Sequence, residues 1–274
     1  MSTTKDTQKT WSVIVCSIDA GKYAHIVQSY ERLLADRAFE IIGIHDATSL
    51  AEAYNRGIVR SRGDIVVFSH DDILILDDDF ASKVEQRLAQ DFDVLGFAGA
   101  TAVADGYWWS AGPEHQRGAV SHAPPGRAQL SLDIFGCTGA KVEHAQVIDG
   151  LCMIANRRAI EIQQFDAHNF DGFHLYDVDF SLSAHLQGLR VGIMTDVPIL
   201  HMSRGSFGAS WLRYRAIFAR KHAATLGRTP DAPLPEPDLP RARTLMFDDA
   251  ASLCQFWHAG KLHRVAVAMQ RNKQ

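Results

Sequence analysis

Three residues, His70, Asp71 and Asp72, form the segment of this sequence that points most directly to chemistry. They follow the apolar run at 64–69 (DIVVFS), which predicts a buried β-strand, so the acidic side chains come where that strand ends. In open α/β sheets, ligands bind beyond the carboxyl ends of the strands. Carboxylates at that edge can hold a divalent cation and, through the cation, a phosphate group. The segment therefore predicts metal-dependent chemistry on a diphosphate.

Two more groups of this kind stand at the ends of other predicted strands. Asp46 follows the second strand and His201 follows a late one. If the strand ends converge, Asp46, Asp72 and His201 share one cleft. Carboxylates suit Mg²⁺ or Mn²⁺, and an added imidazole favours Mn²⁺. On spacing alone, however, three separate surface groups are the more common arrangement.

Alternating strand and helix patterns must position these groups. The expected strands lie at 11–17, 40–45, 64–69, 93–98, 146–155 and 190–195, and the expected helices at 23–36, 47–62, 80–90, 156–164, 177–187 and 209–226. This alternation predicts an α/β fold with a Rossmann-like, mostly parallel central sheet flanked by helices. The stretch 104–127, rich in Gly, Pro and aromatic residues, predicts a long loop or irregular hairpins.

Proline content divides the chain towards its C-terminus. Residues 229–240 hold five of the nine prolines, which argues against regular structure there and predicts a stiff linker. We expect a polar tail at 1–10, one main domain at 11–228, a Pro-rich linker at 229–242 and a helical C-terminal segment at 243–274. The apolar residues of that last segment would suit core packing, a homodimer contact or an interfacial membrane helix, with packing or dimerisation favoured.

The overall composition bounds the class of protein. With 274 residues and 46% hydrophobic content, the chain can bury a full core. A formal net charge of -4 argues against a general nucleic-acid binder, which would carry a strong basic excess. The four cysteines are scattered, and no stretch reaches the roughly 20 apolar residues of a membrane span. We expect a soluble cytoplasmic protein, with peripheral contact at the inner face of the membrane left open.

Four segments in a fixed order resemble a known family. They read HDATSLAEAYNRG at 45–57, GDIVVFSHDDI at 63–73, IDGLCMIANRRA at 148–159 and FDGFHLYDVDFSLSAHLQGLRVGI at 170–193, and His201 follows them. Together they resemble the inverting family 2 glycosyltransferases of GT-A fold, in the branch whose DxD metal motif reads His-Asp-Asp. The resemblance spans residues 11–221 and implies a GT-A fold, a nucleotide-sugar donor and bound Mn²⁺ or Mg²⁺.

The resemblance places several of these residues on the donor side. Asp72 is implied as a metal ligand, with His201 completing the metal or diphosphate site, and Asp71 as a contact to the ribose or the donor sugar. Asp46 is implied to contact the nucleotide base. Arg204 matches phosphate geometry beside glycines that permit a closing movement, although a plain surface position is equally open. The full donor-side set is Ser17, Asp46, Asn55, Asp71, Asp149, Gly150 and Arg204.

The catalytic Glu-Asp pair of the family falls on Tyr176 and Asp177, so the resemblance implies Asp177 as the general base, with Tyr in place of Glu. From the residues alone, Asp177 could equally be a helix cap. Asp179 lies roughly opposite Asp177 on a helix, so the two carboxylates are not expected to act as equivalent bases. The base would remove the acceptor's proton while the metal offsets charge on the departing diphosphate.

Further residues are expected around the sugar. Asp149 and Gly150 fall at the floor of the sugar and acceptor pocket, where Gly permits close backbone approach. The segment YWW at 107–109 could stack on a saccharide, although filling a core is the more common role of aromatics. His174, just before the expected base, could line the acceptor side.

The sequence therefore predicts a metal-dependent inverting glycosyltransferase that moves one sugar from a nucleotide-sugar to an acceptor hydroxyl. A UDP-sugar is the favoured donor, and the acceptor is a glycan, a lipid-linked glycan or a small molecule. The QxxRW motif of processive members is missing, which favours single-sugar transfer. A catalytically silent sugar-nucleotide-binding protein is the main alternative, because His70 and Tyr176 replace commoner acids. A sugar nucleotidyltransferase is less favoured, because no Gly-rich phosphate loop follows the first strand.

Overall fold

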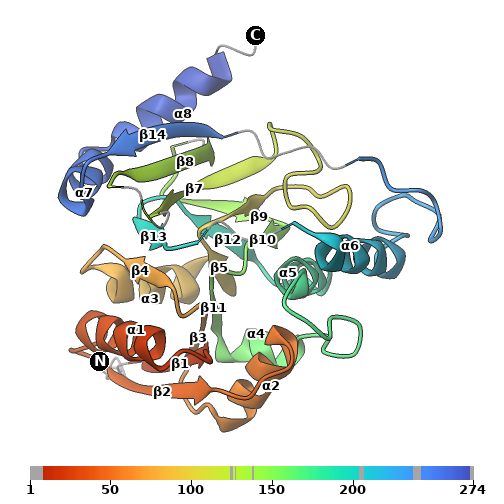
Figure 1. Cartoon of the computed structure of the whole chain (residues 1–274), viewed down its shortest axis with the longest axis horizontal. Helices are drawn as coiled ribbons and strands as arrows, with labels where there is room; N and C mark the ends of the chain where they lie inside the picture. Colours follow the sequence, from red (N-terminus) through yellow and green to blue (C-terminus); the bar gives the residue numbers. More distant parts are fainter. Residues whose placement is uncertain are drawn as a thin grey trace, which may run out of the picture.

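The first of two sheets has seven strands in the order β2-β1-β3-β11-β5-β12-β9 (Figure 1). The structure is a computed structural model that describes residues 9–123, 126, 128–137, 139–203, 207–236 and 242–271. The strands are β1 (Thr10–Cys16), β2 (Ala38–Ile44), β3 (Ile65–Ser69), β5 (Val94–Gly96), β9 (Val142–Ala145), β11 (Cys152–Asn156) and β12 (Val191–Met194). All but β9 and β11 run in the same direction. The expected mostly parallel central sheet is confirmed.

Helices flank this sheet, as the alternation of patterns predicts. They are α1 (Ala20–Leu33), α2 (Leu50–Arg60), α3 (Phe80–Gln90), α4 (Arg157–Ile162) and α5 (Tyr176–Leu186). Asp19 caps α1 and Ser49 caps α2, each accepting backbone N–H groups of the first turn. A Cβ added at Gly57 of α2 would lie 2.3 Å from Cγ2 of Ile14. The missing side chain lets α2 pack directly on β1.

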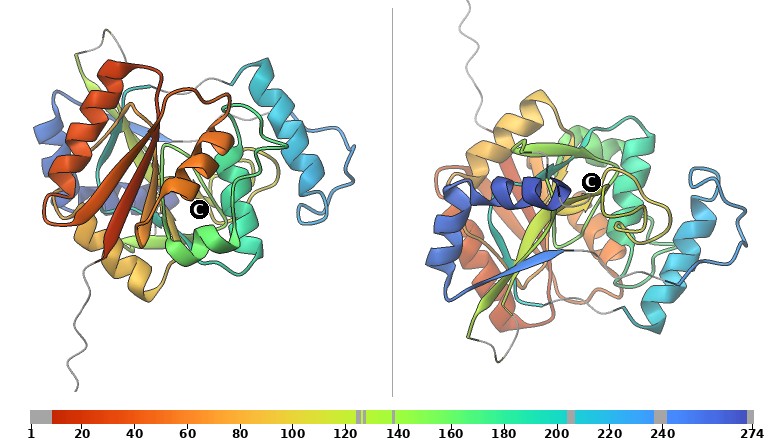
Figure 2. Two further views of the ribbon diagram at one scale, coloured as in Figure 1. Left: turned by 90° about the horizontal axis from the view of Figure 1, so that it is seen from below. Right: turned by 90° about the horizontal axis from the view of Figure 1, so that it is seen from above.

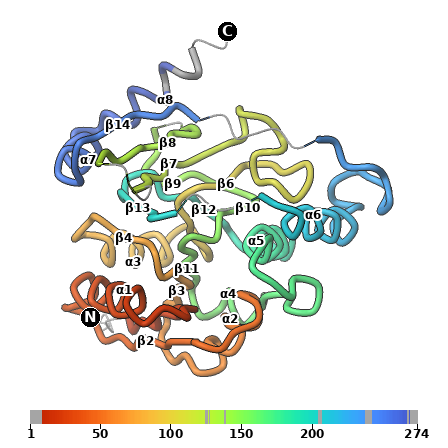
Figure 3. The backbone as a smooth tube through the Cα atoms, viewed as in Figure 1, coloured from red at the N-terminus to blue at the C-terminus, as the bar shows by residue number. Residues whose placement is uncertain are grey.

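The second sheet lies on the far side of the molecule from β1 and β2, as the chain trace in Figure 3 shows. Its strands are β4 (Ile73–Ile75), β6 (Ala98–Ala100), β7 (Gln116–His122), β8 (Leu130–Gly136), β10 (Val147–Ile148), β13 (Ile199–His201) and β14 (Arg243–Phe247). Their order is β10-β6-β7-β13-β4, and β8 joins β7 to β14. The sequence predicted a long loop or irregular hairpins at 104–127. Strand β7 forms there and pairs antiparallel with β8, and only Ala119 and Val120 in QRGAVSH give it an apolar signal.

The C-terminal segment differs from the expected purely helical one. It begins with strand β14, which pairs antiparallel with β8, and only then continues as α7 (Ala250–His258) and α8 (Lys261–Arg271). The strand signal is weak because β14 is an edge strand without a fully buried side chain. Leu253 and Trp257 of α7 are buried with Leu132 and Ile134 of β8. Buried apolar side chains of α7 and α8 therefore form a second core together with β8.

One helix stands apart from both sheets. Helix α6 (Ala209–Lys221) and the segment that follows it lie at one edge of the molecule in both views of Figure 2. Its buried side chains include Trp211, Tyr214 and Phe218, which face the body of the protein. Within the described residues, no helix combines the length and the apolar character that crossing a bilayer requires. The four cysteines, all within those residues, form no disulfide.

Candidate active site

The short turn between β3 and β4 carries His70, Asp71 and Asp72. Strand β13 pairs antiparallel with β4 and sets His201 opposite Ile73. This register brings Nε2 of His201 to 3.2 Å from Oδ1 of Asp72. Two segments that are more than a hundred residues apart therefore meet at the strand end that the sequence singled out.

The side chains of His70, Asp72 and His201 form one cluster. Nδ1 of His70 lies 4.0 Å from the same Asp72 oxygen. One ligand atom from each residue falls within 4.8 Å of the other two. A carboxylate with two imidazoles suits a divalent cation of the Mn²⁺ type. The three residues present here therefore fit a metal ion.

A hydroxyl group fixes the orientation of His70. The Tyr176 hydroxyl donates to the carbonyl oxygen of Gly150 over 3.3 Å, so it accepts a hydrogen bond from Nε2 of His70 at 2.9 Å. A neutral imidazole that donates through Nε2 keeps its lone pair on Nδ1, the nitrogen that faces Asp72. Metal-binding histidines are commonly oriented by such a partner. Tyr176, where the resembled family has Glu, thus acts on the cluster, which sequence reasoning missed.

The protonation states of Asp72 and His70 suit cation binding. Burial disfavours the Asp72 carboxylate, but the hydrogen bond and charge of His201 outweigh it and hold the Asp72 pKa below its usual range. Burial, together with the charge of His201, lowers the pKa of His70. Near neutral pH, Asp72 is therefore ionised and His70 neutral, as metal ligands must be.

Asp177 lies in the first turn of α5. Its Oδ2 accepts the backbone N–H of Gly150 at 2.7 Å. Burial, and then the negative charge of Asp149, raise the pKa of Asp177 to about 7. The residue before the helix, Leu175, has a φ of 60° in the left-handed region, an unfavourable conformation that tertiary contacts must hold. A carboxyl group with this pKa is suited to accept a proton near neutral pH.

Position 150 has no room for a side chain, because residues of α5 lie too close for a Cβ atom. A Cβ at this position would lie 2.3 Å from the Tyr176 hydroxyl and 2.8 Å from Cβ of Asp177. The missing side chain therefore lets the backbone at Gly150 approach the start of α5, and the expected approach to a sugar stays a prediction. Asp149, just before it, accepts the indole N–H of Trp108 through Oδ2 at 3.2 Å. The Asp149-Gly150 pair therefore links the metal cluster, the expected base and an aromatic side chain.

A cavity of about 690 Å³ opens beside these groups. The expected residues in its lining are His70, Trp108, Trp109, Asp149, Gly150, His174, Asp177 and His201. The lining also contains unexpected residues, among them His122, Asp133, Phe135, Phe207, Trp211 and Thr244. Alternation along β8 was the available signal, because Leu132 and Ile134 face the core while Asp133 lies on the other face. Aromatic walls with a few polar groups are typical of small-molecule sites.

The carboxyl ends of β1, β2 and β3 carry other residues expected on the donor side, and these residues are not in the lining of the cavity. Ser17 follows β1, and its hydroxyl donates to Oδ2 of Asp71 at 2.6 Å. Asp46 follows β2 and pairs with Arg56 at 2.7 Å, and its side chain is 74% exposed. The sequence correctly placed these residues at one sheet edge. Asp46 does not belong to the candidate metal cluster, which among the described residues comprises His70, Asp72 and His201.

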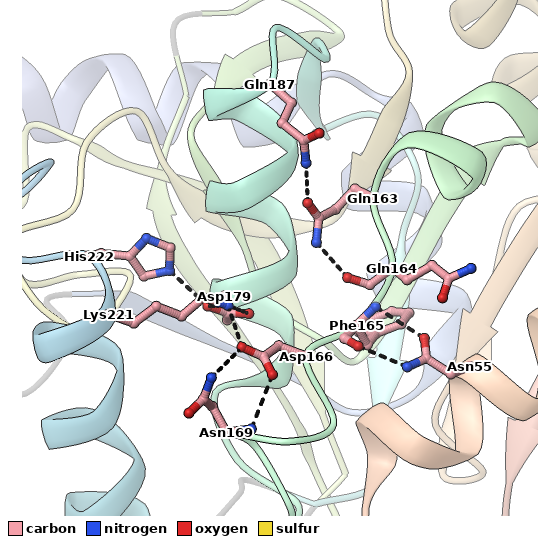
Figure 4. A network of polar contacts seen from close by, with 10 residues as sticks. All are labelled: Asn55, Gln163, Gln164, Phe165, Asp166, Asn169, Asp179, Gln187, Lys221 and His222. Carbon is pink, nitrogen blue, oxygen red and sulfur yellow. Dashed lines mark hydrogen bonds and ion pairs between the residues drawn. The ribbon is translucent and has the colours of Figure 1, made fainter.

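Asn55, which was expected on the donor side, contacts the backbone of a loop. The side-chain amide of Asn55 exchanges two hydrogen bonds with the backbone of Phe165, at 2.8 and 3.1 Å, so it holds a loop (Figure 4). Arg204 lies outside the described residues. Asp179 is fully buried and bonded to Lys221 and His222, which agrees with its expected position away from the base.

Comparison with known proteins now identifies the family. A family model described as a glycosyltransferase-like family matches residues 12–222. The chain belongs to this family. No curated protein matches the sequence.

Solved structures share the fold of this glycosyltransferase. The mannosyltransferase PcManGT from Pyrobaculum calidifontis, in complex with GDP-Man and Mn²⁺, matches with a TM-score of 0.51 and 14% identity, over 98% of this chain and 77% of that chain. GalNAc-T7 with UDP, GalNAc and Mn²⁺ matches with a TM-score of 0.54 and 10% identity, over 93% of this chain and 55% of that chain. At identities this low, the similarity shows the fold alone. The shared fold confirms the expected GT-A architecture.

Proposed function

We propose that this glycosyltransferase moves one sugar from a nucleotide-sugar to an acceptor hydroxyl, with inversion at the anomeric carbon. The observation that carries the proposal is a shared cavity. The half-buried Asp177 side chain, whose pKa is raised to about 7, lines the same space as His70 and His201. A proton acceptor and a candidate cation cluster on one cavity are the two parts that displacement from a diphosphate needs.

In this proposal Asp72 and His201 hold Mn²⁺ or Mg²⁺, and Nδ1 of His70 lies within reach of the same ion. A cation bound there would offset negative charge on the departing nucleoside diphosphate. The hydrogen bond from His70 to Tyr176 keeps the other ring nitrogen turned towards Asp72. The mixture of carboxylate and imidazole favours Mn²⁺ over Mg²⁺. Mn²⁺ in the complexes of PcManGT and GalNAc-T7 supports a divalent cation.

The donor nucleotide would occupy the edge formed by the ends of β1, β2 and β3. Asp71, held by Ser17, would contact the ribose or the donor sugar, and Asp46 the base. The proposed donor-side residues are Ser17, Asp46, Asn55, Asp71, Asp149, Gly150 and Arg204. UDP is the first candidate nucleotide. Because PcManGT was solved with GDP-Man and GalNAc-T7 with UDP, both nucleotides belong in the test.

Asp177 would act on the acceptor. It takes the proton of the acceptor hydroxyl while the acceptor oxygen bonds to the anomeric carbon and the bond from that carbon to the diphosphate oxygen breaks. Attack from the face opposite the leaving group inverts the centre. Positive charge develops on the sugar ring in such a reaction, so the nearby Asp149 carboxylate would also lower the barrier.

Incubating the full chain with Mn²⁺, a panel of UDP- and GDP-sugars and a mixture of hydroxyl acceptors tests this proposal. We expect release of nucleoside diphosphate from one donor, and an NMR spectrum of the product showing the anomeric configuration opposite to that of the donor. Tight donor binding without turnover on any acceptor would favour the silent sugar-nucleotide-binding protein. Retention of configuration would overturn the single displacement at Asp177.

A further inference from the structure

Two oppositely charged side chains meet between helix α6 and the segment 105–109, which follows β6. Nη2 of Arg215 donates to Oδ2 of Asp105 at 2.5 Å, and the two side chains are 4% and 5% exposed. Neither residue lines the cavity that the described residues form beside Asp177. A buried ion pair adds little net stability over apolar residues, and the best-supported role of such pairs is to fix one arrangement of the chain. The arrangement fixed here is that of the segment 105–109.

Several contacts anchor this segment to α6. Oδ1 of Asp105 accepts the backbone N–H of Tyr107 at 2.9 Å. The Tyr107 ring stacks on Trp211 of α6, with centroids 3.7 Å apart, and the guanidinium group of Arg215 lies 4.9 Å from the centre of the Tyr107 ring. Stacking and cation–π contacts of this kind favour a single ring orientation. The segment is therefore held to α6 through both its charge and its aromatic ring.

The same segment reaches Asp149 through Trp108. The indole N–H of Trp108 donates to Oδ2 of Asp149 at 3.2 Å, and Oδ1 of Asp149 accepts the backbone N–H of Leu151 at 3.1 Å. Both oxygens of this carboxylate are therefore bonded. Because one of the two donors is Trp108, the position of Asp149 depends on where the segment 105–109 lies.

The segment also packs against the residue before α5. A Cβ added at Gly106 would lie 2.8 Å from Cδ1 of Leu175 and 3.2 Å from Cα of Arg215, so the bare backbone of Gly106 fits between α6 and Leu175. Leu175 has the left-handed φ of 60° that tertiary contacts must hold, and Asp177 follows two residues later. The segment 105–109 thus contacts the supports of both Asp149 and Asp177.

We infer that Asp105 and Arg215 are positioning residues, whose buried ion pair fixes the segment 105–109 so that Trp108 holds Asp149 beside Asp177. This inference rests on the proposed function, because Asp149 and Asp177 are the carboxylates that would act on the sugar and the acceptor. Asp105 and Arg215 act through other residues and touch neither substrate. Helix α6 then serves the reaction from outside the cavity.

Exchange of the Trp108 indole proton with solvent, followed by NMR on the ¹⁵N-labelled full chain, tests the link without any substrate. Trp108→Phe identifies the signal by its loss. Asp105→Asn removes the charge at nearly constant size, so the bond to Asp149 should open more often and the indole proton should exchange at least about tenfold faster. Asp196→Asn is the matched control, because Asp196 pairs with Arg87 at 2.7 Å away from the cavity lining. Its exchange should equal that of the wild type.

Kinetics of sugar transfer test the consequence. Asp105→Asn should lower kcat by about 10- to 100-fold, because small displacements of reacting groups cost this much. The KM for the donor and the affinity for Mn²⁺ should stay at their wild-type values, because the segment 105–109 contacts neither the β1–β3 edge nor the metal cluster through any printed bond of Asp105. A rise in the donor KM with unchanged kcat would overturn the positioning role.

The outcomes separate this inference from the proposed function. Wild-type indole exchange in Asp105→Asn, or equal acceleration in Asp196→Asn, would overturn the link between the ion pair and Trp108. A wild type without turnover, whose indole exchange still responds to Asp105→Asn, would overturn the proposed function and support the link. If Asp105→Asn melts well below the wild type, Arg215→Lys decides instead, because it keeps the charge and loses the planar group over Tyr107. Faster exchange there supports the inference, and an unchanged rate overturns it.

Discussion

At the scale of single residues, the site depends on pairs rather than on isolated side chains. Tyr176 orients His70, Ser17 holds Asp71, and Gly150 contacts both residues that begin α5. The sequence pointed to Asp72 and His201 because acidic and imidazole groups at strand ends are visible as patterns, and to Asp177 through the resemblance to the glycosyltransferase family. It did not reveal the Tyr176–His70 bond, because that contact depends on how α5 meets β3 in space.

The bond from His70 to Tyr176 gives a first prediction. Tyr176→Phe removes the hydroxyl that fixes the His70 ring, and loss of such a partner lowers metal affinity by about 10- to 100-fold. Titration with Mn²⁺, followed by electron paramagnetic resonance, measures the change. Tyr214→Phe is the control, because it removes another buried tyrosine hydroxyl, bonded to Asp171, on α6. Equal Mn²⁺ affinity in Tyr176→Phe and the wild type would contradict the proposed ligand role of His70.

The raised pKa of Asp177 predicts a pH dependence. A carboxyl group accepts a proton only when ionised, so kcat/KM should rise with pH and level off above the Asp177 pKa of about 7. Asp149→Asn removes a negative charge that raises this pKa, so the inflection should move to lower pH. Profiles of kcat/KM from about pH 5 to about pH 9 measure the inflection in the wild type and its shift in Asp149→Asn. A wild-type profile without an inflection, or a shift to higher pH in Asp149→Asn, is the contrary result.

At the scale of elements, a buried network ties α6 to α5, the helix that carries the expected base (Figure 4). Oδ1 of Asp179 lies 2.7 Å from Nε2 of His222, and Oδ2 accepts from Nζ of Lys221 at 2.8 Å. Lys221 also donates to Asp166 at 2.7 Å. Asp179 is fully buried, so its charge depends on these partners. The network holds the first turn of α5 against the C-terminal end of α6.

Breaking this network should be costly. Asp179→Ala leaves Lys221 and His222 without their buried partner, and losing one member of a buried ion pair costs about 3–5 kcal/mol of unfolding free energy. Urea denaturation followed by circular dichroism measures the loss. Asp171→Ala removes an exposed carboxylate that pairs with Arg213, and it should cost no more than about 1 kcal/mol. Similar losses in the two variants would mean that the network does not stabilise the fold.

The elements themselves were predictable to different degrees. Strands β1, β2 and β3 could be found because their apolar, β-branched runs are long and are separated by helical patterns. Strand β14 could not, because its five residues include no buried side chain and lie after a proline-rich stretch. Without β14, Thr244 cannot be placed beside Asp133. The strand and the contact between Thr244 and Asp133 were therefore missed for the same reason.

At the scale of the whole molecule, the two sheets divide the work of the proposed reaction. The ends of β1, β2 and β3 would take the donor, and the second sheet supplies His201 and part of the lining of the cavity. The alternation of strands and helices was enough to predict the first sheet. Pairing within the second sheet could not be predicted, because strands such as β4 and β13 have three residues each and meet across long sequence separations.

Packing of the C-terminal segment gives a prediction at this scale. Trp257 is buried, and its indole N–H donates to the Thr195 carbonyl at 3.0 Å. Trp257→Ala should therefore cost about 3–5 kcal/mol of unfolding free energy, as for other large core residues. Met246→Ala, in β14 with 47% of the residue exposed, should cost less than about 1 kcal/mol. Urea unfolding of both variants tests this, and a loss below 1 kcal/mol in Trp257→Ala would indicate that the segment is a loosely attached appendage.

The central claim is that a divalent cation held by Asp72 supports sugar transfer from a nucleotide. The most direct measurement is Mn²⁺-dependent release of nucleoside diphosphate from the donor that the wild type uses, compared among wild type, Asp72→Ala and the surface control Asp248→Asn. The account predicts a loss of at least about 100-fold in Asp72→Ala, equivalent to about 2.7 kcal/mol of barrier, and no loss in the control. Turnover in Asp72→Ala at the wild-type rate, with unchanged dependence on Mn²⁺, would contradict it.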